Sequence, residues 1–328
     1  MRHQRNASRH AHRGRDGLAG AIVLAVAAWS SVARAEPPQL APTCPCPEEV
    51  ARSLAGHRFV PFIIVDWPFI DSDFVSTSSL GIFRLELEPL PIVGRVLRDT
   101  DGDVVAAAQS FRGSWAITRW LGINARLTAA EIVAIDVPSA FEIGAHGAYG
   151  GDGGVALRLI RSERFQLTAR FDVGWAKTEG VLPSRLPSSP LTEGRIFTTA
   201  RPAAAAALTL APWLGLQASF SAARRQRDLD HDGDDTSWLI AGAVGASLVL
   251  APLPILFEAG YELSDEEGRD VNIVSTEILL GAEDLRHRGE LGIYYHGRAN
   301  LDLGAAVTFE LTDDDRRGMG HVRLAYYF

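Results

Sequence analysis

Apolar and polar residues alternate along much of the chain after residue 78. In residues 165–175 every second residue is apolar, and the residues between them are polar, charged or glycine. Residues 255–263 and 301–311 repeat the pattern. Since successive side chains of a β-strand point to opposite faces, a period of two predicts strands with one apolar and one polar face. We therefore expect an all-β fold.

Counted along the chain, this pattern predicts about 12 strands, and an even number is expected for a single-chain barrel. An even count requires residues 272–296 to be one long strand. If that segment were two strands, a further strand would have to come from residues 59–70. The predicted strands are residues 79–88, 105–119, 122–134, 140–160, 164–176, 194–210, 213–226, 237–250, 254–264, 272–296, 300–311 and 320–328.

The length of these strands separates two kinds of β-fold. Soluble β-sandwiches also have strands with one apolar face, but their strands average nearer five or six residues. Strands of about ten residues are long enough to cross a bilayer at a tilt. Tight turns and longer polar loops alternate between them, as in outer-membrane barrels. The tight turns are expected near residues 121–122, 161–164, 211–212 and 251–254, and the long loops at 177–194, 227–236, 264–271 and 312–320.

The last residues of the chain continue the alternation and end in an aromatic residue. Val322, Leu324, Tyr326 and Phe328 share one face, and Arg323 lies on the other. In this respect the chain resembles bacterial outer-membrane β-barrel proteins, in which such a closing strand is recognised by the barrel assembly machinery. The resemblance implies that these four apolar residues form the assembly signal. It also implies that residues 78–328 form a single antiparallel transmembrane β-barrel, surrounded by the lipid of a Gram-negative outer membrane.

The first 35 residues have the parts of a secretory signal peptide. Five arginines precede a short apolar run, residues 18–29, and small residues at Ala33 and Ala35 mark a cleavage site. The apolar run is too short to span a bilayer comfortably. We expect residues 1–35 to be removed on export to the outer membrane.

Residues 36–77 are expected to form a periplasmic extension. Residues 47–56 have the features of a short helix, with proline at the start and glycine at the end. The apolar segment 59–70 contains two prolines, which a central strand does not tolerate. It is interpreted either as a partial plug of the periplasmic mouth or as an extended lead-in to the first strand. Cys44 and Cys46 are either paired in a strained loop or free.

Charge excludes one class of partner and leaves the lumen open to two interpretations. Removing residues 1–35 takes six Arg and one Asp from a chain of net charge −8, which leaves −13 and argues against nucleic acid. The polar faces carry both signs, which argues against strong anion or cation selectivity. At about 12 strands these charges either pair across the lumen or line a narrow passage. The candidate pore-lining residues are Arg126, Arg158, Arg164, Arg170, Glu258, Glu262, Asp302, Glu310 and Arg323.

One loop has a spacing that suits a hard cation. Asp228, Asp230, Asp232 and Asp234 alternate around a glycine, as carboxylates do in calcium loops. The position of the bidentate Glu in such loops holds Leu239, so a solvated acidic loop is the competing interpretation. Calcium is therefore the one cofactor to consider.

The sequence favours a porin-like passive channel for small solutes. A hydrolase at the barrel rim is one alternative, because residues 230–232 read Asp-His-Asp in an expected surface loop. His146 and His296 lack a serine neighbour on the same face, so the pairing of barrel lipases is missing. The other alternative is a non-conducting structural or ligand-binding barrel with an acidic loop.

Overall fold

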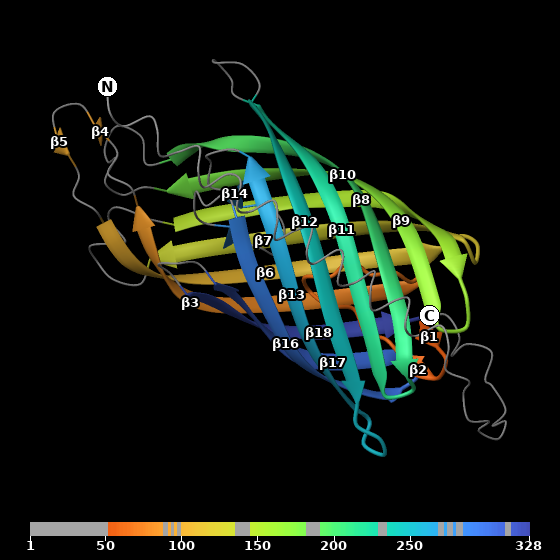
Figure 1. The fold of residues 1–328 in the computed structure, drawn as a ribbon. Helices are drawn as coiled ribbons and strands as arrows, with labels where there is room; N and C mark the ends of the chain where they lie inside the picture. Colours follow the sequence, from red (N-terminus) through yellow and green to blue (C-terminus); the bar gives the residue numbers. More distant parts are fainter. Residues whose placement is uncertain are drawn as a thin grey trace, which may run out of the picture. The chain divides into compact units, whose positions relative to one another are not determined.

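Twelve long antiparallel strands close into a barrel in the computed structural model (Figure 1). The structure describes residues 52–87, 91–92, 95–96, 100–134, 145–181, 191–228, 235–267, 272–273, 278–279, 285–311 and 316–328. Each barrel strand pairs with the next along the chain, and the last closes onto the first through Tyr327 and Asp73. The prediction of an all-β barrel with about 12 strands is confirmed. The strands are β3 (Asp73–Leu87), β6 (Thr100–Ala116), β7 (Leu121–Ala134), β8 (Ala145–Arg161), β9 (Phe165–Val181), β10 (Leu191–Ala211), β11 (Leu214–Asp228), β12 (Asp235–Val249), β13 (Ile255–Glu267), β16 (Leu285–Arg298), β17 (Leu301–Leu311) and β18 (Arg316–Tyr327).

Apolar side chains point out of the barrel and polar side chains point in. On β9, Phe171 and Val173 are 46% and 52% exposed, whereas Asp172 between them is 5% exposed. This is the reverse of a soluble β-protein, and it follows from the period of two in each strand. Large exposed side chains of this kind surround the barrel, with Trp115, Trp120 and Trp213 near one end and Trp175 and Trp238 nearer the other.

The connections at one end of the barrel are short. Residues 117–120, 162–164, 212–213, 250–254 and 299–300 join successive strands there. At the other end the long loops that the sequence predicts lie mostly outside the described residues. We call the two ends the tight-turn end and the loop end. Among the residues that the structure describes, no helix is long and apolar enough to cross a membrane.

The prediction of one long strand over residues 272–296 is wrong. β14 (Asn272–Ile273) and β15 (Ile278–Leu279) form a separate two-stranded sheet, and the barrel strand β16 starts only at Leu285. The reason is the length of its neighbour, because Leu285 already pairs with Asp265, two residues before β13 ends. Residues before about 283 would extend past β13 and find no ladder partner. β4 (Pro91–Ile92) and β5 (Arg95–Val96) likewise pair only with each other.

The structure also corrects the start of the described chain. Within the predicted helix 47–56, residues 52–56 instead belong to a hairpin of β1 (Ser53–Leu54) and β2 (His57–Arg58), and residues 47–51 lie outside the described residues. Ala55 and Gly56 have φ values of 44° and 83°, and two consecutive positive values are the signature of a two-residue hairpin turn, which a helix cannot contain. Residues 59–72 contain no strand, and the barrel starts at Asp73, not at 78. The predicted signal peptide and the two cysteines lie outside the described residues.

Candidate functional site

Residues 52–72, which we call the luminal segment, lie inside the barrel. Phe59, Val60, Phe62, Trp67 and Phe69 are each at most 4% exposed, although they belong to no strand. They pack against inward-facing residues of the wall, including Ala207, Ala243 and Leu256. The wall supplies the apolar cover that a segment of this composition needs.

The luminal segment enters and leaves at the tight-turn end. Arg58 donates hydrogen bonds to the carbonyl oxygens of His296 and Ala299, at 3.1 and 2.9 Å, beside the turn at 299–300. The carbonyl oxygen of Ser72, at the other end of the segment, accepts a hydrogen bond from the Phe328 amide at 3.1 Å. In Figure 1, β1 and β2 lie near the C-terminus, in agreement with these contacts. The chain therefore turns back within the barrel and does not traverse it.

Side chains of the wall bind the main chain of the luminal segment. Gln166 donates to the Pro68 carbonyl oxygen at 2.6 Å, Arg170 to that of Trp67 at 3.0 Å, and Gln217 to that of Val60 at 2.9 Å. Thr168 and Arg323 donate in the same way to the carbonyl oxygens of Pro68 and Pro61. Buried carbonyl groups need partners, and a segment without a neighbouring strand can find them only on the wall.

Glu290 of β16 binds the segment where it turns back. Its carboxylate accepts hydrogen bonds from the Ile63 amide at 3.0 and 2.9 Å and from the Ile64 amide at 3.1 Å. The side chain is fully buried. Hydrogen bonds from amides to a charged acceptor are roughly twice as strong as neutral ones. This residue therefore fixes the inner end of the segment.

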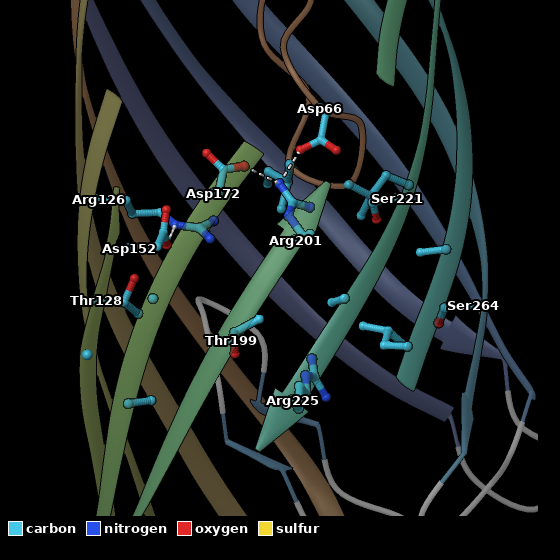
Figure 2. Close-up of a pocket in the computed structure, with 18 of the residues that line it drawn as sticks. Asp66, Arg126, Thr128, Asp152, Asp172, Thr199, Arg201, Ser221, Arg225 and Ser264 are labelled. Carbon is cyan, nitrogen blue, oxygen red and sulfur yellow. Dashed lines mark hydrogen bonds and ion pairs between the residues drawn. The ribbon is translucent and has the colours of Figure 1, made fainter. Parts of the chain in front are cut away.

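An ion-pair network lies beside this turn (Figure 2). Arg201 of β10 contacts Asp66 of the segment at 2.7 Å and Asp172 of β9 at 3.3 Å. Burial raises the pKa of Asp66, but Arg201, with smaller effects from Arg170 and Arg126, outweighs it and holds the pKa below its usual value. Asp66 is therefore ionised at neutral pH and ties the segment to the wall.

Glycines on the inner face make room for the segment. A Cβ at Gly245 would lie 2.5 Å from the ring of Phe62, and one at Gly215 would lie 2.6 Å from the ring of Phe59. A Cβ at Gly260 would lie 3.2 Å from the side chain of Ile64. A glycine within a strand often marks such a close approach.

The ends of the segment are held by buried polar groups. Arg52 and Arg58 both contact Asp302, the second at 3.1 Å, and Arg52 lies 3.4 Å above the ring of Tyr327. Burial lowers the pKa of His57 to about 4, against a smaller opposing effect of its bond to Pro212. It is therefore neutral, and its ring bonds the Ser247 hydroxyl at 2.8 Å.

The pKa of Asp71, just before the first barrel strand, is raised, whereas that of His57 is lowered. Burial and the neighbouring charge of Asp73 raise its pKa to about 7, although Trp67 and Arg112 oppose the change. The indole nitrogen of Trp67 donates to Asp71 at 3.1 Å. His57 and Asp71 thus make the segment sensitive to pH in two opposing ways.

Between the segment and the loop end the lumen keeps a cavity of about 180 Å³ (Figure 2). Arg126 and Asp152, 2.7 Å apart, and Arg288 and Glu262, 3.2 Å apart, form ion pairs on its wall. A smaller space of about 90 Å³ lies between the segment and strands β3, β6 and β7. Charges of both signs line these spaces, and hydroxyl groups such as Thr128 and Ser221 lie among them.

The structure places most candidate pore-lining residues on the inner face. Arg126, Arg170, Glu258, Glu262, Asp302, Glu310 and Arg323 lie there, and several of them bind the luminal segment or pair with other wall residues. Arg158 lies on the same face near the tight-turn end, where a bulge shifts the register after it. Arg164 is different, because it lies in the turn before β9 and not within a strand.

The other candidate residues divide between the described and undescribed parts of the chain. Val322, Leu324, Tyr326 and Phe328 point outward and are 41–66% exposed. Asp228 ends β11, and Asp230, Asp232 and Asp234 lie outside the described residues, as does His231. Within the described part of the chain no three acidic, His or Cys side chains form a group that suits a metal ion.

Sequence reasoning missed Glu290 and Arg201, two of the wall residues that bind the inner end of the segment. Arg201 precedes Pro202 in an alanine-rich strand, and Glu290 follows Gly289 in a stretch without clean alternation. Both residues occupy inward positions of their strands, so the alternation of faces along each strand could have placed them in the lumen. Their partners on the segment could not be inferred from it.

No protein-family model matches the chain, and no curated protein matches its sequence. Solved structures do resemble it. The translocator domain of the autotransporter NalP from Neisseria meningitidis has a TM-score of 0.53 at 12% identity, over 78% of this chain and 88% of that one. The transport unit of the autotransporter AIDA-I from Escherichia coli has a TM-score of 0.51 at 11% identity, over 78% and 90%. The chain has the fold of outer-membrane β-barrel proteins. At these identities the likeness concerns the fold alone.

Proposed function

We propose that this protein is an outer-membrane barrel whose narrow lumen passes small solutes only when the luminal segment moves away from the wall residues that bind it. The observation that carries the proposal is the binding of the segment's main chain by inward-facing side chains of the wall. A barrel of 12 strands is intermediate between those filled by side chains and those with a wide channel. A buried segment of this size is enough to close it.

The composition of the lumen supports passage without strong charge selection. The remaining cavity carries arginines and carboxylates together, with hydroxyl groups between them. Rings of one charge sign select ions, and a mixture of signs does not. We therefore expect small hydrophilic solutes, either neutral or of either charge. The outer membrane is the proposed location because lipid-facing apolar side chains surround the barrel.

Single-channel conductance in a planar bilayer tests the proposal. Refolded residues 36–328 are expected to be closed most of the time, with rare openings. A variant in which residues 53–70 are replaced by a short Gly/Ser linker is expected to give stable conductance steps, because the twelve strands are kept and the seal is lost. Circular dichroism and resistance of the barrel to detergent unfolding check that both proteins fold.

Two outcomes would contradict the proposal. Silence of both proteins would mean that the lumen does not conduct even when the segment is removed. Equal, steady conductance of both would mean that residues 53–70 do not close the lumen. Either result would favour a structural or ligand-binding barrel.

A further inference from the structure

Three polar side chains lie together on the outer surface of the barrel. Ser76 and Ser78 of β3 and Gln109 of β6 point outward, and we call them the polar patch. The Ser78 hydroxyl donates to the Gln109 amide oxygen at 2.5 Å, and the Gln109 amide nitrogen donates to the Ser76 hydroxyl at 3.0 Å. Ser78 is exposed and the other two are half-buried. The patch is thus a hydrogen-bonded cluster on a surface that is otherwise largely apolar.

The patch lies well inside the apolar band. Phe74 and Phe111 flank it toward the tight-turn end, with ring centroids 6.0 Å apart, and Leu80 and Ile82 flank it toward the loop end, 59% and 66% exposed. Gln109 precedes Trp115 by six residues on β6. At about 3.3 Å per residue and a tilt of about 40°, this places it ~15 Å from the tryptophan, near the middle of a band of about 25 Å. Lipid headgroups and bulk water do not reach this depth.

Hydrocarbon cannot satisfy the remaining hydrogen-bonding capacity of the patch. The Ser78 hydroxyl uses its one hydrogen on Gln109 and keeps its lone pairs, and the Gln109 amide oxygen can accept a second bond. Polar groups left in an apolar medium without partners raise the free energy. The surrounding outward residues Ala107 and Ala129 are small and exposed, so another protein surface can approach closely.

We propose that the polar patch is the centre of a contact between two copies of this chain in the membrane. The Gln109 amide nitrogen also donates to the Ser110 carbonyl oxygen at 3.4 Å, so the hydrogen that the patch can still donate is that of the Ser76 hydroxyl. The patch is complementary to itself because the Ser78 hydroxyl and the Gln109 amide oxygen of a second copy can accept this hydrogen. Two copies inserted in the same direction and related by a two-fold axis along the membrane normal meet with the same residues at the same depth. The inference needs the barrel to span a bilayer, as in the proposed function, but it does not need the lumen to conduct.

Disulfide cross-linking in lipid vesicles tests this contact. The expected mature chain, residues 36–328, is used with Cys44→Ser and Cys46→Ser, and Ser78→Cys places one thiol in the patch. Val244→Cys is the matched control, because it is 47% exposed and lies on β12, on another part of the wall. It is five residues from the tight-turn end of its strand, as Ser78 is. At low protein-to-lipid ratio the Ser78→Cys protein is expected to form a dimer band and the control is not.

A second variant separates specific contact from collision. Gln109→Leu in the Ser78→Cys background is expected to weaken dimer formation roughly three- to tenfold, the effect of losing polar contacts between membrane-embedded surfaces. A difference in gel mobility between unheated and heated samples confirms that each barrel is folded. Conductance is recorded separately. Equal cross-linking of both cysteines, or none in either, would overturn the proposal. Cross-linking of Ser78→Cys to a different protein in cell membranes would also overturn it, whereas loss of conductance alone would bear only on the proposed function.

Discussion

Replacing Glu290 by Gln isolates the strongest link between the wall and the luminal segment. The carboxylate accepts bonds from two main-chain amides, Ile63 and Ile64, and is fully buried. Hydrogen bonds to a charged group contribute about 1.5–3 kcal/mol each, and a neutral amide oxygen still accepts one bond worth about 1 kcal/mol. The carboxylate also loses hydration when the segment is seated, which offsets part of the gain. We therefore expect the closed state to lose about 2 kcal/mol relative to the open state.

This free energy corresponds to a measurable change in gating. At 1.36 kcal/mol per factor of ten, a loss of about 2 kcal/mol increases the ratio of open to closed channels roughly 30-fold. Single-channel recordings of residues 36–328 measure this ratio directly. Glu262→Gln is the control, because Glu262 pairs with Arg288 on the wall, 3.2 Å away. An open fraction of Glu290→Gln equal to that of the wild type, or to that of the control, would refute the reasoning.

Three further predictions concern a wall glycine that faces the luminal segment, the pH dependence of closure, and assembly in cells. Gly245→Val is expected to raise the open fraction, because the added Cβ would lie 2.5 Å from an aromatic ring of the segment, whereas Gly242→Val on the same strand has open space and should leave recordings unchanged. Because the seated segment lowers the pKa of His57 from 6.5 to about 4, the closed state binds fewer protons between these values, and closure weakens as pH falls through them. Because it raises the pKa of Asp71 from 3.8 to about 7, the closed state binds more protons in that range, and closure strengthens as pH falls. When the pH is lowered from 7 to 5, we expect the open fraction to fall in the His57→Gln protein, to rise in the Asp71→Asn protein and to change little in the wild type. Identical pH profiles of the three proteins would contradict this. Phe328→Ser should change the unfolding of the refolded protein only slightly, since the residue lies beyond the end of β18 and its side chain is 66% exposed, but should strongly reduce the amount assembled in cells. A loss of stability as large as the loss of assembly would argue against a signal role.

The candidate site could be predicted from sequence only in part. Strand parity placed Arg126, Arg170 and Arg323 on the inner face, where the structure has them. It did not show that Arg170 and Arg323 bind main-chain carbonyl groups of the luminal segment, because those partners are 103 and 262 residues away in the sequence. Contacts at such separation leave no local periodicity.

The luminal segment shows the same limit from the other side. Its prolines and apolar residues excluded a central strand, but they fitted a plug and an extended lead-in equally well. Gly245 and Gly215 were a usable signal, since glycines at inward positions indicate that something approaches the wall closely. Which segment approaches could not be read from them.

The sequence by itself determined the strands and their faces. Alternation has this power because the direction of each side chain follows from the backbone of its own strand, so a local pattern is enough. The tertiary structure alone decided where β16 begins, because that depends on the length of its neighbour β13. It also decided what occupies the lumen. Asp66 meets Arg201 and Glu290 meets two main-chain amides only after the wall has closed around residues 52–72 and brought these distant groups together.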